Sequence, residues 1–317
     1  MKTVYNAYKG VLCCAMLCAM LAACAPARTS SQVQTEDSLV VATTQAPEQT
    51  EKDPIAATTQ TTQTTQTAQT TQTTQTNPVD SNEPSTGTSK PGVYTPVPIS
   101  GTVPQGARVS ASYFDHVVFV GDSVSVKLFY YNSANNRVFG NAEFLTAGSL
   151  GSANALWPVS GQSVHPTWEG QKMLLEDSIP LTGKKMLYIM LGMNDIAVYG
   201  IDKSVQNMQI LLEKIQRNVP DLQIVIESMT PIASTSKLLS NTGLCPANID
   251  AYNHKLSELC EQKGWSFVDV ASVMYDADGY LRREYCSDPD NMGVHFTDAG
   301  CHAWADYLYT HPVLSKE

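Results

Sequence analysis

Short apolar runs alternate with helical patterns along the C-terminal part of this chain of 317 residues. The apolar runs lie at 116–120, 186–191 and 222–226, with a weaker one at 266–270. The helical patterns, which open near an Asp or Asn suited to capping, lie at 204–219, 249–262 and 298–309. Apolar runs of this length fit strands that are buried on both faces. Strands that alternate with helices predict a mostly parallel sheet between two helical layers, so we expect a three-layer α/β/α fold.

The first 24 residues have the layout of an export signal. Lysines precede an apolar run at 11–23, which is too short to span a bilayer comfortably as a mature helix. The run ends in Leu-Ala-Ala-Cys, which looks like a bacterial lipobox, so we expect Cys24 to be acylated and to become the first mature residue. Two acyl chains would hold the protein on the outer face of a membrane. A plain signal peptide or an uncleaved anchor is the alternative.

A long Thr/Gln-rich tract follows, with Thr-Thr-Gln repeats between 58 and 76. Such a segment buries too little apolar surface to offset the entropy lost on ordering, so we expect a disordered tether. Tracts of this composition can also be O-glycosylated stalks. The chain therefore divides into a signal and lipobox at 1–24, a tether at 25–107 and one folded domain at 108–317.

Charge and metal-binding patterns exclude some functions. The formal net charge of -10 argues against nucleic-acid binding, which would need a basic patch. The sequence has no Cys-x-x-Cys pair and no His-rich cluster with zinc-like spacing, so we expect no structural metal. Nothing in the motifs below implies an organic cofactor either.

The C-terminal part holds four cysteines, which would be outside the cell if the signal is real. Four cysteines allow three full pairings, and the sequence does not choose among them. We single out Cys286 with Cys301 as a candidate disulfide, because this pair brackets His295. Buried free thiols are the alternative.

The first apolar run ends in Gly121-Asp122-Ser123, and a helical stretch follows. Sites in parallel sheets collect at the carboxyl ends of the strands, which places Ser123 at that edge and at a helix N-terminus. Free backbone N–H groups and the helix dipole favour developing negative charge there. Ser123 is therefore a candidate nucleophile, and an ordinary turn with a helix cap is the alternative.

Two further residues have the chemistry that a serine nucleophile needs. Asn194 follows the run at 186–191, where its side chain can aim an N–H donor at the space above Ser123. His295 precedes the last helical pattern and can act there as a general base toward a serine hydroxyl. Taken singly, the Asn would be a cap and the His an ordinary surface or core residue.

Together these motifs resemble the SGNH hydrolases, also called the GDSL esterase family. The resemblance covers about 115–310 and keeps the order Ser, Gly, Asn, His. It implies a flavodoxin-like SGNH hydrolase fold in which Ser123 is the nucleophile and His295 is the base.

The resemblance also implies an oxyanion hole with three donors. These are the backbone N–H of Ser123, the backbone N–H of Gly148 in Thr-Ala-Gly-Ser, and the side chain of Asn194. Gly151 competes with Gly148 for the second role.

The acid that would orient His295 departs from the family pattern. The family usually has an Asp three residues before the His, where this chain has Met292. We interpret the segment as a Ser-Asp-Gly-Val-His pattern interrupted at 289–292, which makes Asp288 the orienting acid. Asp290 is the runner-up because it is nearer, and a dyad with a backbone carbonyl behind the imidazole is the third hypothesis.

These expectations combine into one hypothesis: an exported, lipid-anchored serine esterase that works through an acyl-serine intermediate. A long stalk would let it reach polymers, so we expect O-acetyl groups on carbohydrate or cell-wall glycan as substrate. The aromatic-rich stretch at 157–168 would wall the acyl or sugar site, with ordinary loop packing as the alternative. A lipid esterase, an acyltransferase to sugar and a non-catalytic surface lipoprotein are the rival interpretations.

Overall fold

The computed structural model describes residues 92–240 and 243–314. The signal, the lipobox with Cys24 and the tether before residue 92 lie outside the described residues, so their assignment stays a prediction. Within the two described ranges, no helix is long and apolar enough to cross a membrane.

Five parallel strands form the central sheet. They are β1 (Val117–Gly121), β2 (Glu143–Thr146), β5 (Met186–Met190), β6 (Gln223–Glu227) and β7 (Ser266–Val268). Their order across the sheet is β2-β1-β5-β6-β7, and every neighbouring pair is parallel. Counted along the chain this is the order 2-1-3-4-5, which is that of flavodoxin-like sheets. The four predicted strands are confirmed, and the short edge strand β2 is added to them.

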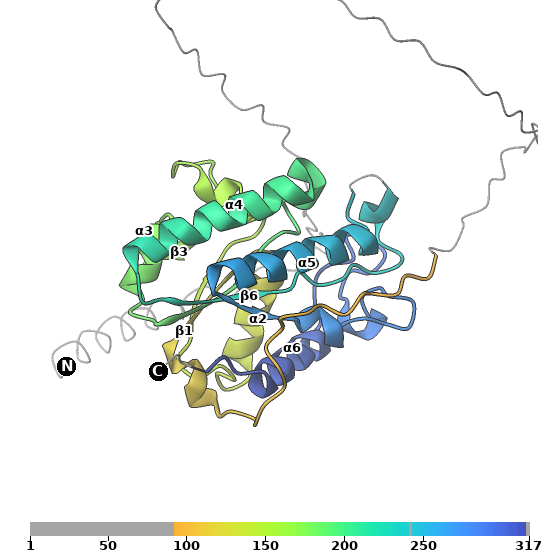
Figure 1. Cartoon of the computed structure of the whole chain (residues 1–317), viewed down its shortest axis with the longest axis horizontal. Helices are drawn as coiled ribbons and strands as arrows, with labels where there is room; N and C mark the ends of the chain where they lie inside the picture. Colours follow the sequence, from red (N-terminus) through yellow and green to blue (C-terminus); the bar gives the residue numbers. More distant parts are fainter. Residues whose placement is uncertain (1–91, 241–242, 315–317) are drawn as a thin grey trace, which may run out of the picture. The chain divides into compact units, whose positions relative to one another are not determined.

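Helices cover both faces of the sheet (Figure 1). One face carries α3 (Leu175–Leu181), α4 (Ile196–Asn218) and α5 (Pro246–Lys263), and the other carries α2 (Ser123–Ala134) and α6 (Asp298–Thr310). Side chains of a strand alternate between the faces, so each face has its own hydrophobic core. In β1, Val118 and Val120 belong to the core under α3 to α5, whereas Val117 and Phe119 belong to the core under α2 and α6. The expected three-layer fold is confirmed.

Short elements fill the connections. They are the antiparallel pair β3 (Thr167–Trp168) and β4 (Gln171–Lys172), and the 3-10 turns η1 (Ala111–His116), η2 (Asn154–Leu156), η3 (Lys237–Ser240), η4 (Val270–Val273) and η5 (Arg283–Tyr285). The predicted helix at 204–219 is part of α4, which begins earlier, at Ile196. Gly200, with a φ of 73°, kinks α4 between the two pieces.

The folded domain begins before residue 108. Residues 92–107, which the sequence analysis assigns to the tether, form a strap that packs along the domain. Thr102 bridges Phe267 in the parallel sense at the edge of β7, and the Tyr94 hydroxyl donates to Asp250 at 2.7 Å. The boundary in the sequence analysis is therefore wrong. Low hydrophobicity marked the segment as tether, whereas its backbone pairs with a sheet edge that only the fold provides.

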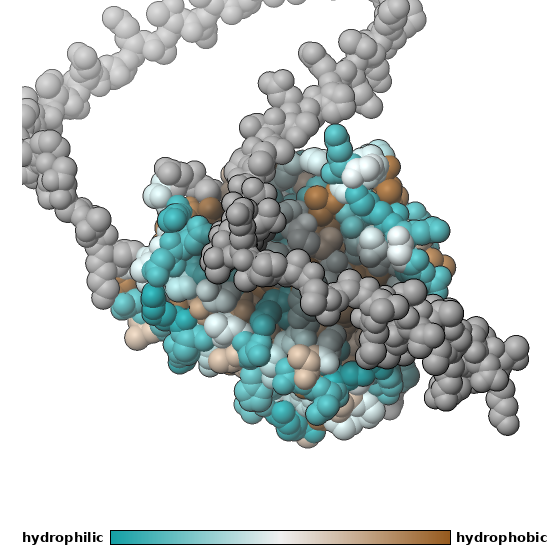
Figure 2. Space-filling view, turned by 180° about the vertical axis from the view of Figure 1, so that it is seen from behind, coloured by the Kyte–Doolittle hydropathy of each residue, from teal (hydrophilic) through white to brown (hydrophobic). Residues whose placement is uncertain are grey.

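The side of the molecule shown in Figure 2 does not by itself point to a site. On the side shown in Figure 2, hydrophilic residues predominate among the described ones, and hydrophobic residues are scattered in small groups. The candidate site residues are therefore the polar residues at the carboxyl ends of the strands. The order of the sheet reverses at β1, and ligands bind beside such a reversal in sheets of this type.

Candidate active site

Ser123 is the first residue of α2, directly after β1. Asp122 caps the helix by accepting a 2.9 Å hydrogen bond from the backbone N–H of Val124. A Cβ at Gly121 would lie 2.0 Å from the Oγ of Ser125, so only glycine fits this turn. The strand–glycine–cap sequence thus sets Ser123 at a helix N-terminus, where the first backbone N–H groups have no partner within the helix.

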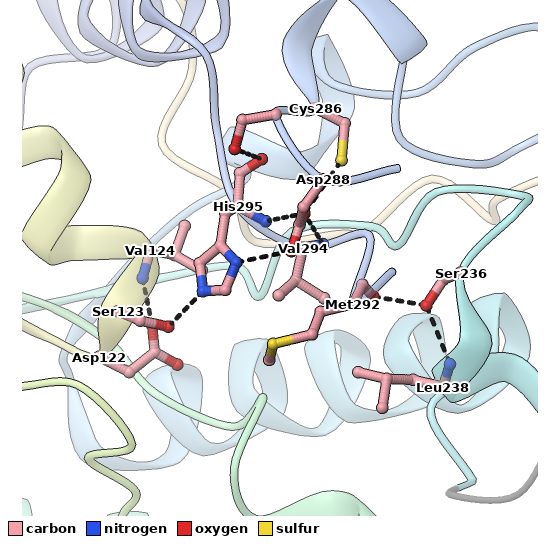
Figure 3. A network of polar contacts seen from close by, with 11 residues as sticks. Asp122, Ser123, Val124, Ser236, Leu238, Cys286, Asp288, Met292, Val294 and His295 are labelled. Carbon is pink, nitrogen blue, oxygen red and sulfur yellow. Dashed lines mark hydrogen bonds and ion pairs between the residues drawn. The ribbon is translucent and has the colours of Figure 1, made fainter. Parts of the chain in front are cut away.

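His295 links the serine to an acid (Figure 3). Its Nε2 lies 3.0 Å from the Oγ of Ser123, and its Nδ1 lies 2.8 Å from the Oδ2 of Asp288. The pair of Asp288 and His295 comes from the loop before α6, far from Ser123 in the chain. Folding of the parallel sheet brings the two segments together at its carboxyl edge.

Asp288 is held by several donors. Its Oδ1 accepts from the backbone N–H groups of Val294, at 3.2 Å, and of His295, at 3.1 Å, and from the Cys286 thiol at 3.5 Å. Burial raises the pKa of the Asp288 carboxyl, but the hydrogen bonds with His295 outweigh that effect and leave its pKa below the ordinary value. The carboxylate is therefore charged and oriented toward the imidazole at neutral pH.

The structure brings Asp288 to His295 and leaves Asp290 elsewhere. Asp290 is an exposed partner of Arg283, at 3.1 Å. The Nδ1 of His295 faces a carboxylate, which is the geometry of the first hypothesis and differs from a dyad held by a backbone carbonyl. The backbone oxygen of Asp288 accepts from the N–H groups of Asn291, at 2.9 Å, and Gly293, at 3.0 Å, so residues 289–292 form a closed turn.

The two candidate glycines of the oxyanion hole differ in whether their surroundings leave room for a side chain. The Gly151 N–H already donates to the Asn154 side chain at 2.8 Å, and a Cβ there would lie 2.9 Å from the Asp195 carboxylate. Gly148 is exposed, and a Cβ there would meet no atom within 4 Å. A side chain at residue 148 would thus meet open space, whereas packing at residue 151 requires glycine.

The amide of Asn194 lies beside the helix cap of Ser123. Its Nδ2 donates to the Oδ2 of Asp122 at 3.2 Å and to the backbone oxygen of Leu150 at 3.1 Å. An amide nitrogen has two hydrogens, so both donors have acceptors in the resting site. An oxyanion that uses Asn194 would share a donor with Asp122 or Leu150.

Asp195 is a site residue that the sequence analysis did not single out. It is fully buried, and it accepts from the N–H of Ser152 at 2.9 Å, from the Ser152 hydroxyl at 3.0 Å and from the N–H of Ala153 at 3.0 Å. These bonds tie the segment after Gly148 to the start of α4. The signal was present in the sequence, because Asp195 directly follows Asn194 in the same motif.

Two buried carboxyl groups sit close to the serine turn. Burial and, less strongly, the charge of Asp195 raise the pKa of Asp122 to about 7, although the hydrogen bond from Val124 opposes this. Burial also raises the pKa of Asp195, although its bonds to Ala153 and Ser152 oppose this. The turn after β1 and the loop after β5 therefore each carry a buried carboxyl group, and Asp122 is hydrogen-bonded to Asn194.

The candidate disulfide is absent from this structure. Cys286 and Cys301 are both buried free thiols, as the alternative in the sequence analysis had it. The Cys286 sulfur faces Asp288, and Cys301 packs on the side of α6 that faces the core under α2 and α6. Burial raises the pKa of each thiol to about 12, so both are protonated at neutral pH. Among the described residues, no group of three or more His, Cys, Asp or Glu side chains is placed to hold a metal ion.

One known protein family matches the chain in sequence pattern. The sequence model of the GDSL-like Lipase/Acylhydrolase family matches residues 119–303, which run from β1 into α6 and include the whole candidate site. No curated protein matches the chain in sequence.

Several solved structures are similar to the chain at low identity. A candidate acylhydrolase from Bacteroides fragilis has 18% identity and a TM-score of 0.45, over 61% of this chain and 83% of that one. A GDSL-like lipase from Bacteroides thetaiotaomicron has 15% identity and a TM-score of 0.45, over 63% and 86% of the two chains. A carbohydrate acetylesterase family member from Sinorhizobium meliloti has 14% identity and a TM-score of 0.42, over 61% and 95%.

Proposed function

The chain belongs to the GDSL-like lipase/acylhydrolase family, and we propose that it is an exported serine esterase whose nucleophile is Ser123. Membership in this family supports an ester-hydrolysing enzyme. One observation carries the assignment of roles. His295 contacts Asp288 through its Nδ1, at 2.8 Å, and Ser123 through its Nε2, at 3.0 Å. A serine, its base and the acid that orients the base are the groups that activate a hydroxyl nucleophile.

In the proposed mechanism, His295 Nε2 takes the proton of Ser123 as the serine Oγ attacks the ester carbonyl carbon. The Asp288 carboxylate stabilises the imidazolium that forms, and Asp288 itself is not protonated. The oxyanion accepts from the N–H groups of Ser123 and Gly148 and from Asn194, and each such donor contributes about 3 kcal/mol in the transition state. His295 then protonates the departing alcohol oxygen. Water attacks the acyl-serine by the same proton transfers and releases the acid.

A non-catalytic surface lipoprotein on the same fold is the second candidate function. Met292 favours it, because this residue stands where the family usually has the acid. The contacts of Asp288 weigh against it, because a site without catalytic use would have no need of a carboxylate held toward His295 by three donors. We therefore keep the esterase as the leading function.

For the substrate we propose O-acetyl groups on carbohydrate or cell-wall glycan. The His295 side chain is 30% exposed and the Asp288 side chain 20%, so an ester on a large polymer can approach the site from solvent. Trp157, 47% exposed, follows the segment that contains Gly148, and Tyr199, 39% exposed, lies shortly after Asn194. Aromatic rings of this kind have an apolar face and a polar edge, which suits contact with a sugar. Lipid esters and acyl transfer to a sugar are the competing outcomes of the tests below.

For the location we propose the outer face of a bacterial membrane, with a lipid on Cys24. The apolar run and lipobox motif support this, and the Thr/Gln-rich tract supplies a spacer. Replacing Cys24 with Ala tests the anchor in the full-length protein expressed in a bacterial host. The wild type should fractionate with membranes and incorporate labelled palmitate, and the variant should do neither. Incorporation by both would refute lipidation at Cys24.

A fluorophosphonate probe tests the nucleophile. It should label the wild-type chain and leave Ser123→Ala unlabelled, and Ser125→Ala, two residues along the same helix, serves as the matched control for a lost hydroxyl. Equal labelling of Ser123→Ala would show that this serine is not the nucleophile.

A panel of acetylated glycans, fatty-acyl lipids and sugar acceptors then tests the substrate. Release of acetate from glycans supports the carbohydrate proposal. Release of fatty acid alone, or appearance of an acylated sugar, would replace it with a lipid esterase or an acyltransferase.

A further inference from the structure

The four residues that interrupt the Asp–His spacing, Pro289 to Met292, are clamped to one neighbouring segment. This segment is the stretch 233–238, which follows β6 and leads into η3. The clamp consists of Thr235 Oγ1 to Pro289 O at 2.8 Å, Lys237 N to Asn291 O at 2.8 Å, Ala233 N to Gly293 O at 2.8 Å, and Ser236 Oγ to Met292 O. A flexible bulge would lack such a series of hydrogen bonds. The insertion is therefore an ordered part of the carboxyl edge of the sheet.

The clamp directs the Met292 side chain inward. Gly293 has a φ of 71°, and a Cβ there would lie 2.6 Å from the Cβ of Ser236, so the two segments approach as closely as glycine permits. Met292 is partly buried and packs, with Leu238, on the core that also contains Val294. Figure 3 shows its thioether reaching from the loop toward the side of the His295 ring where Ser123 lies. The Met292 side chain thus points toward the side of the imidazole on which the reacting serine lies.

The chemistry of the acyl-serine defines which substrate group faces this side. A tetrahedral carbon bound to the Ser123 Oγ carries an oxyanion, a leaving oxygen and the acyl chain. The oxyanion turns to the donors around Gly148 and Asn194, and the leaving oxygen turns to the proton on His295. The acyl chain takes the remaining direction. The side chain that points to that side of the imidazole is apolar Met292, which packs on the same core as Leu238.

We infer that the clamped insertion sets the acyl-chain limit of the enzyme, with Met292 as the side chain that closes the acyl subsite. This inference rests on the proposed function. It deepens that function by naming the substrates as esters of short acyl groups, acetyl first, whatever alcohol they are attached to. Methionine suits such a wall because its unbranched side chain fills irregular apolar space. The position that usually holds the family's acid has thereby become a specificity-determining position.

The test compares p-nitrophenyl acetate, butyrate and octanoate as substrates of the full-length protein and of Met292→Ala. The readout is the ratio of kcat/KM for octanoate to kcat/KM for acetate within each protein. Opening the wall should raise this ratio by about ten-fold or more, which is the size of discrimination that a few methylene groups give in an apolar pocket. Met292→Leu keeps the apolar volume and should keep the wild-type ratio.

Met186→Ala is the matched control, because it removes the same side chain at the amino end of β5, the end of the sheet opposite the site. An unchanged ratio in Met292→Ala, or the same rise in Met186→Ala, overturns the inference. The proposed function fails in a different way, by loss of all turnover in the wild type or by full turnover in Ser123→Ala. The thermal transition of Met292→Ala verifies that this variant folds. If Met292→Ala does not fold, Leu238→Ala provides a second opening of the same wall.

Discussion

The carboxylate of Asp122 and the amide of Asn194 are joined by a 3.2 Å hydrogen bond across the carboxyl ends of β1 and β5. The same carboxylate caps α2 through the N–H of Val124. One buried side chain therefore supports both the helix start that presents Ser123 and the side chain proposed as an oxyanion donor. The two roles use different oxygens of Asp122, so substitutions can separate them.

Asp122→Asn should lower kcat more than it lowers stability. An Asn side chain has one acceptor oxygen, so it can cap α2 or accept from Asn194, but it cannot do both. We expect kcat to fall by about ten-fold to a hundred-fold, short of the loss seen when an oxyanion donor is removed outright. Asp122→Ala should lower both kcat and the thermal midpoint. Steady-state kinetics with thermal unfolding measures the two effects, and wild-type kcat in Asp122→Asn would contradict the coupling.

Asp288→Ala and Asp290→Ala should differ sharply in activity. Asp288 orients His295 at 2.8 Å, whereas Asp290 pairs with Arg283 on the surface. Loss of the orienting acid should lower kcat by about 10³-fold to 10⁴-fold, and loss of an exposed ion pair should leave kcat nearly unchanged. Turnover of p-nitrophenyl acetate gives the comparison. Small and equal losses would favour a His295–Ser123 dyad instead.

Gly151→Ala and Gly148→Ala form a matched pair in one segment. The methyl group at 151 would press on the Asp195 carboxylate at 2.9 Å, whereas the methyl group at 148 would meet open space. We expect Gly151→Ala to lower the free energy of unfolding by about 1–3 kcal/mol and to reduce activity as the segment shifts. Gly148→Ala keeps its N–H and should change stability little. Urea unfolding of both variants checks this, and equal stability losses would refute the packing role of Gly151.

Glu227 should make the protein less stable as the pH rises. This carboxyl lies in the core and accepts from the Trp304 indole at 2.6 Å, and burial raises its pKa to about 8, although the indole bond opposes this. Between its ordinary pKa near 4.5 and about 8, the folded chain retains a proton that the unfolded chain has lost. The free energy of unfolding therefore falls through that window and levels off above it.

Glu227→Gln removes this titration and keeps an acceptor for the indole. Denaturant unfolding at about pH 5 and about pH 9 should show a smaller decline in the variant, by a few kcal/mol. Parallel declines in the two proteins would show that Glu227 does not titrate in this range.

A chain that begins at residue 108 should be less stable than one that begins at residue 92. The longer form keeps the strap, whose Thr102 covers the edge of β7 and whose Tyr94 contacts Asp250. Removing it exposes backbone groups at the sheet edge, so we expect a thermal midpoint lower by several degrees and a greater tendency to aggregate. Differential scanning calorimetry compares the two forms. Equal thermal midpoints in the two forms would show that residues 92–107 do not stabilise the domain and belong to the tether.

Much of this architecture could be predicted from the sequence because it depends on local patterns. Apolar runs such as 186–191 form strands wherever helices cover them, and the cap and glycine around Ser123 are specified by neighbouring residues. The edge strand β2 and the strap escaped prediction because both are short or weakly apolar. Their stability comes from pairing with strands that lie far away in the chain.

The sequence by itself determined the parallel α/β fold, the family and the candidate pair of Ser123 and His295. The sequence ranked Asp288 before Asp290, but only the tertiary structure shows which carboxylate meets His295, because that depends on the path of the chain through 289–292 and on the clamp to 233–238. The tertiary structure also decided that Gly151 serves packing, since its N–H and its missing Cβ face Asn154 and Asp195. Contacts between segments that are remote in the chain leave no periodic pattern in the sequence. The carboxylate that contacts His295 could therefore be identified only in the tertiary structure.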